Sequence, residues 1–364
     1  MHELPVTRVL ELPPMAGNPR NSEGDFIQLT DGRWLLVYTH FEGGDGDHAS
    51  AYLVGRLSSD NGLTWTHEDS LVLPNEGHMN IMSVSLLRLQ DRRMALFYLR
   101  KDSLADCRPC IRISSDEATT WSTPIDVIPA SEPGYYVVNN DRVIQLSSGR
   151  LIVPAALHTA SAGGTLTSQA DSVFSPYGQI FCYLSDDAGA TWRKGQQVLA
   201  EARPEGERVM VQEPGLIELQ DGRVMIFSRT DAGSQYIAYS RDQGQSWSPL
   251  HASDIISPCS PASIAKVPGT GDLLMVWNNH ADIPDELAGK RTPLTSAISR
   301  DEGDTWINVK DLETDPFGWY CYTAIAFAGD HVLLAHTAGD TRENNGLAKL
   351  QITRFPVTWL YEPA

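Results

Sequence analysis

The sequence predicts an all-β fold, a six-bladed β-propeller with four-stranded antiparallel blades. Two patterns indicate it: an apolar hairpin that recurs six times and a turn motif that recurs five times along the chain. The repeats follow one another at intervals of about 50 to 70 residues, a period typical of propellers, which hide their strand edges by radial repetition. Few helices are therefore expected.

The clearest copy of the hairpin covers residues 215–227. Apolar residues 215–219 are followed by a turn at Asp221 and Gly222 and then by the apolar run 224–227. Short apolar runs around a glycine turn predict a β-hairpin. The other five copies have their turns at residues 30–32, 90–92, 147–149, 267–271 and 328–329.

The turn motif S-x-D-x-G-x-T-W lies later in each unit. Its Ser and Asp are expected to hydrogen-bond the turn's own backbone, its Gly to take a positive φ, and its Trp to pack on the sheet. The motif therefore closes a hairpin between the third and fourth strands, and its Asp is structural, because five equivalent hairpins cannot all line one site. The copies are residues 58–65, 114–121, 185–192, 240–247 and 299–306.

The last unit lacks this motif, but residues 347–353 still have the pattern of a strand. Residues 6–12 are expected to add an outer strand to that unit and so close the ring. A single propeller domain over residues 1–364 follows, since chains of this length are often one unit when they form propellers.

Composition restricts the partners and cofactors. The net charge of −18 argues against nucleic acid and anionic membranes, which would be repelled. No basic start followed by an apolar run begins the sequence, which favours a cytoplasmic protein as given, or a secreted or periplasmic one if a signal peptide was trimmed. Five scattered cysteines indicate reduced thiols that are buried. No cofactor or metal is expected, since the histidines lack ligand spacing and no phosphate-binding loop is present.

Residues just before the first strand of each unit should converge at one mouth of the central channel. These segments are rich in carboxylates, amides, arginine and tyrosine, and converging polar groups at such a mouth predict an active site. Glu213 and Arg229 flank the clearest hairpin, where neutral residues would serve equally well. The other candidates in these segments include Arg20, Asp25, Asn80, Asn140, Arg142, Tyr320 and Tyr322.

The repeated S-x-D-x-G-x-T-W resembles the Asp box of the sialidase (neuraminidase) superfamily, and the match covers nearly the whole chain. Glu213, followed by a strand, an Asp-Gly turn and Arg229, is similar to the family's segment with the catalytic Glu and the second arginine. Arg291 is similar in placement to the third arginine. Tyr322 resembles the nucleophile and Asp47 the acid/base.

The resemblance implies a retaining exo-α-sialidase that releases terminal sialic acid or a related nonulosonic acid from glycoconjugates, with a sialylated glycan or other acidic saccharide as partner. Arginine forks bind carboxylates in bidentate fashion. The substrate's own carboxylate would repel an anionic nucleophile, which explains a neutral Tyr helped by a Glu base. An Asp then protonates the leaving oxygen and later activates water.

The sequence also departs from the family pattern. The first arginine normally lies in a Phe-Arg-Ile-Pro-like sequence, whereas residues 24–27 read Gly-Asp-Phe-Ile here and Arg20 is the nearest candidate. Asp45 competes with Asp47 for the acid role, and Tyr320 competes with Tyr322.

Two groups of residues have no family role to carry over, Glu23 and the cluster at residues 139–142. They are candidates for binding the glycerol or N-acyl group of the sugar, or they indicate a different acidic sugar. The expected substrate-binding residues are the three arginines, Arg20, Arg229 and Arg291, together with Asp25, Asn80, Asn140 and Arg142. A glycosidase or lyase for another acidic saccharide, or a non-catalytic carbohydrate-binding propeller, remain alternative functions, and the sequence does not indicate an oligomeric state.

Overall fold

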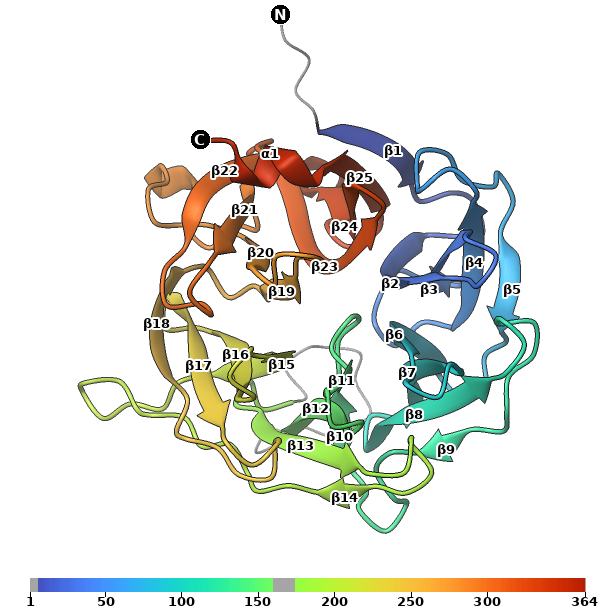
Figure 1. Ribbon diagram of the computed structural model, residues 1–364, viewed down its shortest axis with the longest axis horizontal. Coiled ribbons are helices and arrows are strands. Elements are labelled where there is room, and N and C mark those ends of the chain that lie inside the picture. The colour runs from blue at the N-terminus through green and yellow to red at the C-terminus, as the bar shows by residue number, and fades with distance from the viewer. Residues whose placement is uncertain (1–5, 160–173, 364) are drawn as a thin grey trace, which may run out of the picture.

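The computed structural model describes residues 6–159 and 174–363, and it confirms the all-β propeller. Figure 1 shows the sheets arranged in a ring around a central axis. Helix is scarce, as expected: the described residues form one five-residue α-helix, α1 (Val357–Tyr361), and short 3-10 turns. No helix among them is long and apolar enough to cross a membrane.

The blades follow one another along the chain, each starting with its innermost strand. The first contains β2 (Arg20–Gln28), β3 (Trp34–Phe41), β4 (Ala51–Ser58) and β5 (Ser70–Leu73). The second contains β6 (Asn80–Arg88), β7 (Met94–Ser103), β8 (Asp106–Ser114) and β9 (Ile125–Asp126). The third contains β10 (Tyr135–Val137), β11 (Ile144–Gln145), β12 (Leu151–His158), β13 (Gln179–Ser185) and β14 (Arg193–Lys194).

The remaining blades have the same order. The fourth contains β15 (Val211–Glu218), β16 (Val224–Thr230), β17 (Ser234–Ser240) and β18 (His251–Ile256). The fifth contains β19 (Ser263–Lys266), β20 (Leu273–Trp277), β21 (Leu294–Ser299) and β22 (Ile307–Glu313). The sixth contains β23 (Gly318–Ala328), β24 (His331–Asp340), β25 (Leu350–Pro356) and β1 (Thr7–Leu12).

The ring closes between the two ends of the chain, as predicted. Strand β1 pairs antiparallel with β25, with Thr7 opposite Arg354 and Leu12 opposite Leu350. Figure 1 shows β1 beside β25 at the edge of the sixth blade. One pairing was not predicted: β10 pairs in parallel with β8, with Tyr135 opposite Cys107, and this joins the second and third blades into one nine-stranded sheet.

The apolar core is divided among the interfaces between neighbouring blades. Six clusters of buried side chains occur in the described residues; five are each shared by two adjacent blades, and one contains residues of the first, second and third blades. Ile27 of the first blade packs with Leu86 of the second, for example, and Leu36 of the first with Leu333 of the sixth. Burial of these apolar surfaces holds the blades against one another and fixes the channel that they surround.

The turn motifs have the predicted local geometry. In the first copy, Asp60 accepts hydrogen bonds from the backbone N of Thr64 at 2.8 Å and its hydroxyl at 2.6 Å, and Ser58 accepts one from Gly62 N at 2.9 Å. Gly62 has a φ of 78°, and Trp65 packs against the cluster between the first and sixth blades. Four of the five cysteines are buried free thiols, and Cys259 is half-buried.

We expect Asp60→Ala to destabilise the protein without a change in the chemistry of the central site. Loss of these hydrogen bonds should lower the free energy of unfolding by about 1–2 kcal/mol, measured by urea denaturation. Glu68→Ala is the matched control, because this side chain is 94% exposed and should be neutral. An unchanged stability for Asp60→Ala would contradict the structural role.

Candidate active site

The innermost strands share an unusual backbone feature at the channel. Five of the six blades place a non-glycine residue there in the left-handed region, with φ between 50° and 62°. Such a residue is uncommon and, within a strand, produces a bulge that re-aims its side chain. Four of the five lie at interruptions of the strand register, and Asp141 lies between β10 and β11. The five residues are Glu23, Ser83, Asp141, Glu213 and Tyr322.

Four of these five side chains line a pair of cavities at the channel. The inner cavity has a volume of about 50 Å³ and the outer cavity about 270 Å³. Both are lined by a shared set, namely Asp47, Tyr135, Val137, Glu213 and Tyr322. The inner cavity adds Glu23, Met82, Ser83, Leu99, Lys101 and Asn139, and the outer adds His48, His158, Phe174, Gln212 and Arg229.

Tyr322 and Glu213 are in direct contact between these cavities. The Tyr322 hydroxyl donates a hydrogen bond to Glu213 Oε1 at 3.2 Å, and Arg229 Nη1 lies 2.8 Å from Glu213 Oε2. The Arg291 guanidinium lies 5.3 Å from the centre of the Tyr322 ring. The pair is therefore a phenol and a carboxylate beside two cations, the half-buried Arg229 and the buried Arg291.

Arg20 lines neither cavity, but it is paired with two carboxylates, Glu23 and Asp47, that line the inner one. It is 1% exposed and donates to Asp47 Oδ1 at 2.6 Å, to Glu23 Oε1 at 2.8 Å and to Ser22 Oγ at 2.9 Å. Two side chains of the second blade hold the loop that carries Asp47. Asn80 Nδ2 and Lys101 Nζ both donate to the backbone oxygen of Asp47, at 2.9 and 2.6 Å.

The environments of Tyr322 and Asp47 shift their pKa values in opposite directions. Burial raises the pKa of the Tyr322 phenol, and the charge of Glu213 raises it further. The phenol is therefore neutral at rest. The Asp47 side chain is 52% exposed, and what desolvation it has would raise its pKa, but the charges of Arg20 and Lys101 outweigh this and lower the pKa to about 2. Asp47 is thus a carboxylate near neutral pH while it stays paired with Arg20.

The Asp47 pair should make a pH-dependent contribution to stability. Since the pKa of Asp47 is about 2 in the folded protein and about 3.9 in an unfolded chain, the contribution is present above pH ~4 and lost as pH falls towards 2. We expect the wild type to lose more unfolding free energy than Asp47→Asn between these pH values, by denaturation at each pH. Parallel curves would contradict the pairing.

Of the seven predicted substrate-binding residues, Arg229 alone lines either cavity, whereas all seven were expected to contact a ligand. Three of the others use their polar groups inside the protein. Asp25 accepts from the backbone N of Phe26 and Leu86, at 2.6 and 2.7 Å. Asn140 Nδ2 donates to the backbone oxygens of Gly24 and Tyr322, at 2.8 and 3.0 Å. Their hydrogen-bonding groups are thus used to join innermost strands of different blades.

Arg142 is the third, and it is also a bridge. It donates to the backbone oxygen of Ala262 at 2.8 Å and to Ser263 Oγ at 3.3 Å, which ties the third blade to the fifth. Asn80 is likewise a positioning residue for the Asp47 loop. Arg291 lines neither cavity; it lies against Trp319 and Tyr322 and donates to Cys321 Sγ at 2.8 Å, so it is next to a residue that lines both.

The structure also separates the rival candidates. The side chains of Asp45 and Asp47 are both exposed, but Asp47 lines both cavities, whereas Asp45 lines neither and only its backbone oxygen accepts from Arg20, at 3.1 Å. Tyr320 packs in the apolar cluster between the fifth and sixth blades, whereas Tyr322 lines the cavities.

Two boundaries differ from the sequence reading. Glu213 and Arg229 were expected outside the strands of their hairpin, but they lie within β15 and β16, where Arg229 is opposite Gln212. The left-handed conformation of Glu213 explains this difference, because a bulge absorbs the extra residue and lets the strand continue.

Sequence reasoning missed the contributions of Ser83 and Lys101 to the inner cavity, whereas Asn139 belongs to the cluster at residues 139–142 that it singled out. A signal for the bulge positions exists: Glu23, Ser83 and Glu213 each precede by six residues the leucine that starts the hairpin turn. Lys101 has no such signal, because it comes from β7, the second strand of its blade. No group of three His, Cys, Asp or Glu side chains that could hold a metal ion occurs in the described parts of the chain.

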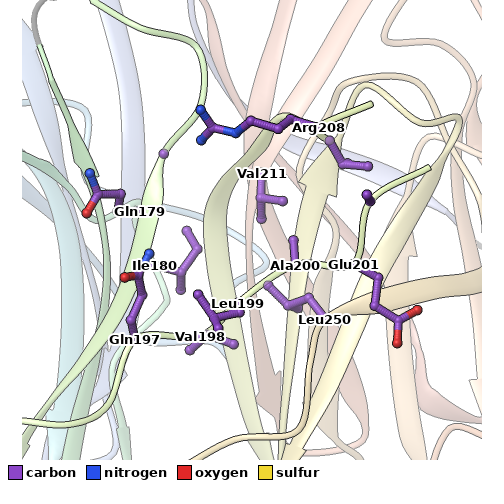
Figure 2. Close-up of a pocket in the computed structure, with 13 residues that line it drawn as sticks. Gln179, Ile180, Gln197, Val198, Leu199, Ala200, Glu201, Arg208, Val211 and Leu250 are labelled. Carbon is purple, nitrogen blue, oxygen red and sulfur yellow. The ribbon is translucent and has the colours of Figure 1, made fainter. Parts of the chain in front are cut away.

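A separate depression lies between the third and fourth blades. It has a volume of about 190 Å³, and Figure 2 shows apolar side chains such as Val198, Leu199 and Leu250 along it. Among the described residues, no tyrosine lines this depression, and Glu201 and Arg208 are its only charged side chains. We therefore assign the catalytic chemistry to the two central cavities.

Comparison with known families decides the relationship of this chain. The model of the BNR repeat-like domain matches residues 73–334, well over half of the sequence. The chain belongs to the BNR repeat-like domain family. The predicted relation to the sialidase superfamily is thereby confirmed, together with the propeller that carries the repeats.

Two curated relatives of this BNR repeat-like domain are named sialidase. The protein from Micromonospora viridifaciens is 27% identical in an alignment of 339 residues that covers 83% of this chain and 46% of that protein. The one from Bacteroides fragilis is 27% identical in an alignment of 225 residues that covers 58% of this chain and 36% of that protein. The chain thus spans less than half the length of these relatives.

Solved structures show the same fold at low identity. The NanB sialidase from Streptococcus pneumoniae superposes with a TM-score of 0.73 at 15% identity, over 98% of this BNR repeat-like domain and 71% of that chain. The intramolecular trans-sialidase from Ruminococcus gnavus gives 0.72 at 15% identity, over 98% and 99%. A Dyadobacter fermentans protein of unknown function gives 0.70 at 16%, over 96% and 99%.

Proposed function

We propose that this protein is a retaining exo-glycosidase of the sialidase type, which releases a terminal sialic acid or related nonulosonic acid. The observation that carries the proposal is the hydrogen bond from the Tyr322 hydroxyl to Glu213, beside Arg229 and Arg291. A buried neutral phenol with a carboxylate base is the nucleophile suited to an anionic sugar. The two arginines supply the charge that such a ligand needs in a protein of net charge −18.

In the first step, Tyr322 Oη attacks the anomeric carbon and its proton passes to Glu213. The bond to the leaving oxygen breaks, and that oxygen takes a proton from the Asp47 carboxyl group. In the second step, Asp47 takes a proton from water, which attacks the same carbon. Tyr322 then leaves and recovers its proton from Glu213, so the sugar retains its configuration.

The pairing of Asp47 with Arg20 bears directly on the acid step. In this pair Asp47 is ionised and Arg20 is fully engaged, so neither is ready for its role. A substrate carboxylate that replaced Asp47 on Arg20 would release Asp47 from this cation and raise its pKa. Binding of the acidic sugar would then prepare both the arginine and the acid.

The proposal is tested by release of the free sugar acid from a fluorogenic aryl α-sialoside. Turnover with retained configuration, followed by NMR of the first product formed, is the expected result. A wild-type protein that does not cleave the sialoside would refute the sialidase assignment.

One observation favours a second candidate, a glycosidase or lyase for another acidic saccharide. Arg20 is held by Glu23 and Asp47, which leaves Arg229 and Arg291 as the arginines beside the phenol. An acidic sugar with a different carboxylate position would need only these two. Parallel assays with other nonulosonic and uronic acid glycosides distinguish the candidates, and binding without cleavage would indicate a carbohydrate-binding propeller.

A further inference from the structure

The inner cavity contains polar groups that the proposed mechanism does not use. Its volume of about 50 Å³ is several times the ~10–15 Å³ that one water needs, yet far too small for a sugar ring. Asn139, Lys101, Ser83 and Glu23 supply its polar lining. The outer cavity, about 270 Å³, shares its central lining residues, so a ring bound there could extend one substituent inward.

Asn139 is the group that points to a ligand. Its side chain lines the inner cavity, the residue is 3% exposed, and Nδ2 has no hydrogen-bond partner among the described residues. Leaving a buried amide donor unpaired is costly, so such a group usually has a water or a ligand as its partner. The matching ligand atom is a hydrogen-bond acceptor.

Charge selects the kind of acceptor. Glu23, Asp47 and Glu213 line the cavity with three carboxylates. The arginines near them, Arg20 and Arg229, are already paired with these carboxylates and do not line this cavity, so Lys101 is the cation among the described residues of its lining. Lys101 is already engaged, because Nζ donates to the backbone oxygen of Asp47. A second anionic group on the sugar would be repelled there, and a neutral one would not.

Glu23 restricts the ligand group further, to one that can also donate a hydrogen bond. Its oxygens accept one bond each, from Arg20 and from the Ser83 hydroxyl, which leaves a lone pair on each for another donor. A hydroxyl group fits both requirements, since it accepts from an amide and donates to a carboxylate. An apolar substituent would leave Asn139 unpaired.

We infer that the inner cavity is a specificity subsite for one neutral hydroxyl of the bound sugar. The hydroxyl oxygen accepts from Asn139 Nδ2, and its hydrogen goes to Glu23. The inference rests on the proposed function for the ring's position, and it adds the substituent that the site reads.

The test compares an aryl α-sialoside with analogues that lack the hydroxyl at C4, C7, C8 or C9, one at a time. In the wild type, one deletion should lower kcat/KM about tenfold or more. In Asn139→Leu, the parent should fall by a similar factor and become equal to that analogue. The other analogues should keep their wild-type ratios to the parent. Asn75→Leu, outside both cavities, is the control and should keep all ratios.

Two results would overturn the inference: equal losses for every substrate in Asn139→Leu, which indicate a structural role, or a wild type that tolerates every deletion. The same ratios are also measured as Kd values of the free sugar acids by calorimetry. An inert wild type refutes the proposed function through the turnover assay, while the Kd ratios still decide whether Asn139 reads a hydroxyl.

Discussion

Tyr322→Phe should lower kcat on an aryl α-sialoside by about 10⁴-fold or more, because it removes the oxygen that attacks the sugar while it keeps the ring. Losses of this order accompany the removal of covalent nucleophiles in other enzymes. The ring should still pack beside Arg291, so binding of the free sugar acid should change little. Steady-state kinetics and calorimetry on the same preparation measure the two effects.

Tyr320→Phe is the matched control. The two tyrosines are neighbours on β23, but Tyr320 packs between blades and its hydroxyl is not part of the cavities. Its replacement should leave kcat within a few-fold of the wild type. Substantial turnover by Tyr322→Phe would remove Tyr322 from the chemistry. Glu213→Gln should resemble Tyr322→Phe, since an amide cannot take the phenol proton.

Asp47→Asn should lower turnover by an amount that depends on the leaving group. Loss of a general acid typically costs about 10²- to 10⁴-fold. The full loss is expected for an alkyl or sugar leaving group, whereas an acidic nitrophenol departs without a proton and should be affected far less. Turnover of a series of aryl sialosides, plotted against the pKa of the phenol, should therefore give a steeper slope in the variant.

Asp45→Asn is the control for this experiment, because the exposed Asp45 side chain reaches neither cavity. It should keep both the wild-type rate and the wild-type slope. If Asp47→Asn loses the same factor on every leaving group, Asp47 does not protonate the leaving oxygen. The result would then favour a role limited to the pairing with Arg20.

The fold could be predicted because its signals are local and repeated. The S-x-D-x-G-x-T-W motif fixes one hairpin in each of five blades through hydrogen bonds within eight residues, as in the copy that ends at Trp65. Closure by residues 6–12 followed from the missing outer strand of the last blade. The parallel pairing of Tyr135 with Cys107 was not predictable, since it depends on how two blades meet in space.

The site was predictable where function requires a residue that the hairpin does not, as with Glu213 and Arg229. In the sequence, Asp25, Asn140 and Arg142 have the same features as substrate-binding residues. They serve the structure instead, because the channel needs polar groups to join its innermost strands. Lys101 is the opposite case, a residue that lines the inner cavity but that the sequence did not indicate. It lies at the end of an ordinary strand, and only folding brings its ammonium to the backbone of Asp47.

Closure of the ring by β1 and β25 also sets the order in which the site can be assembled. Tyr322 belongs to the blade whose outer strand is the first of the described chain. During synthesis, β1 must wait unpaired until β25 has left the ribosome, while the blade that carries Glu213 can form earlier. A chain stopped just before residue 350 therefore cannot close the ring between β1 and β25, although it contains both Glu213 and Tyr322.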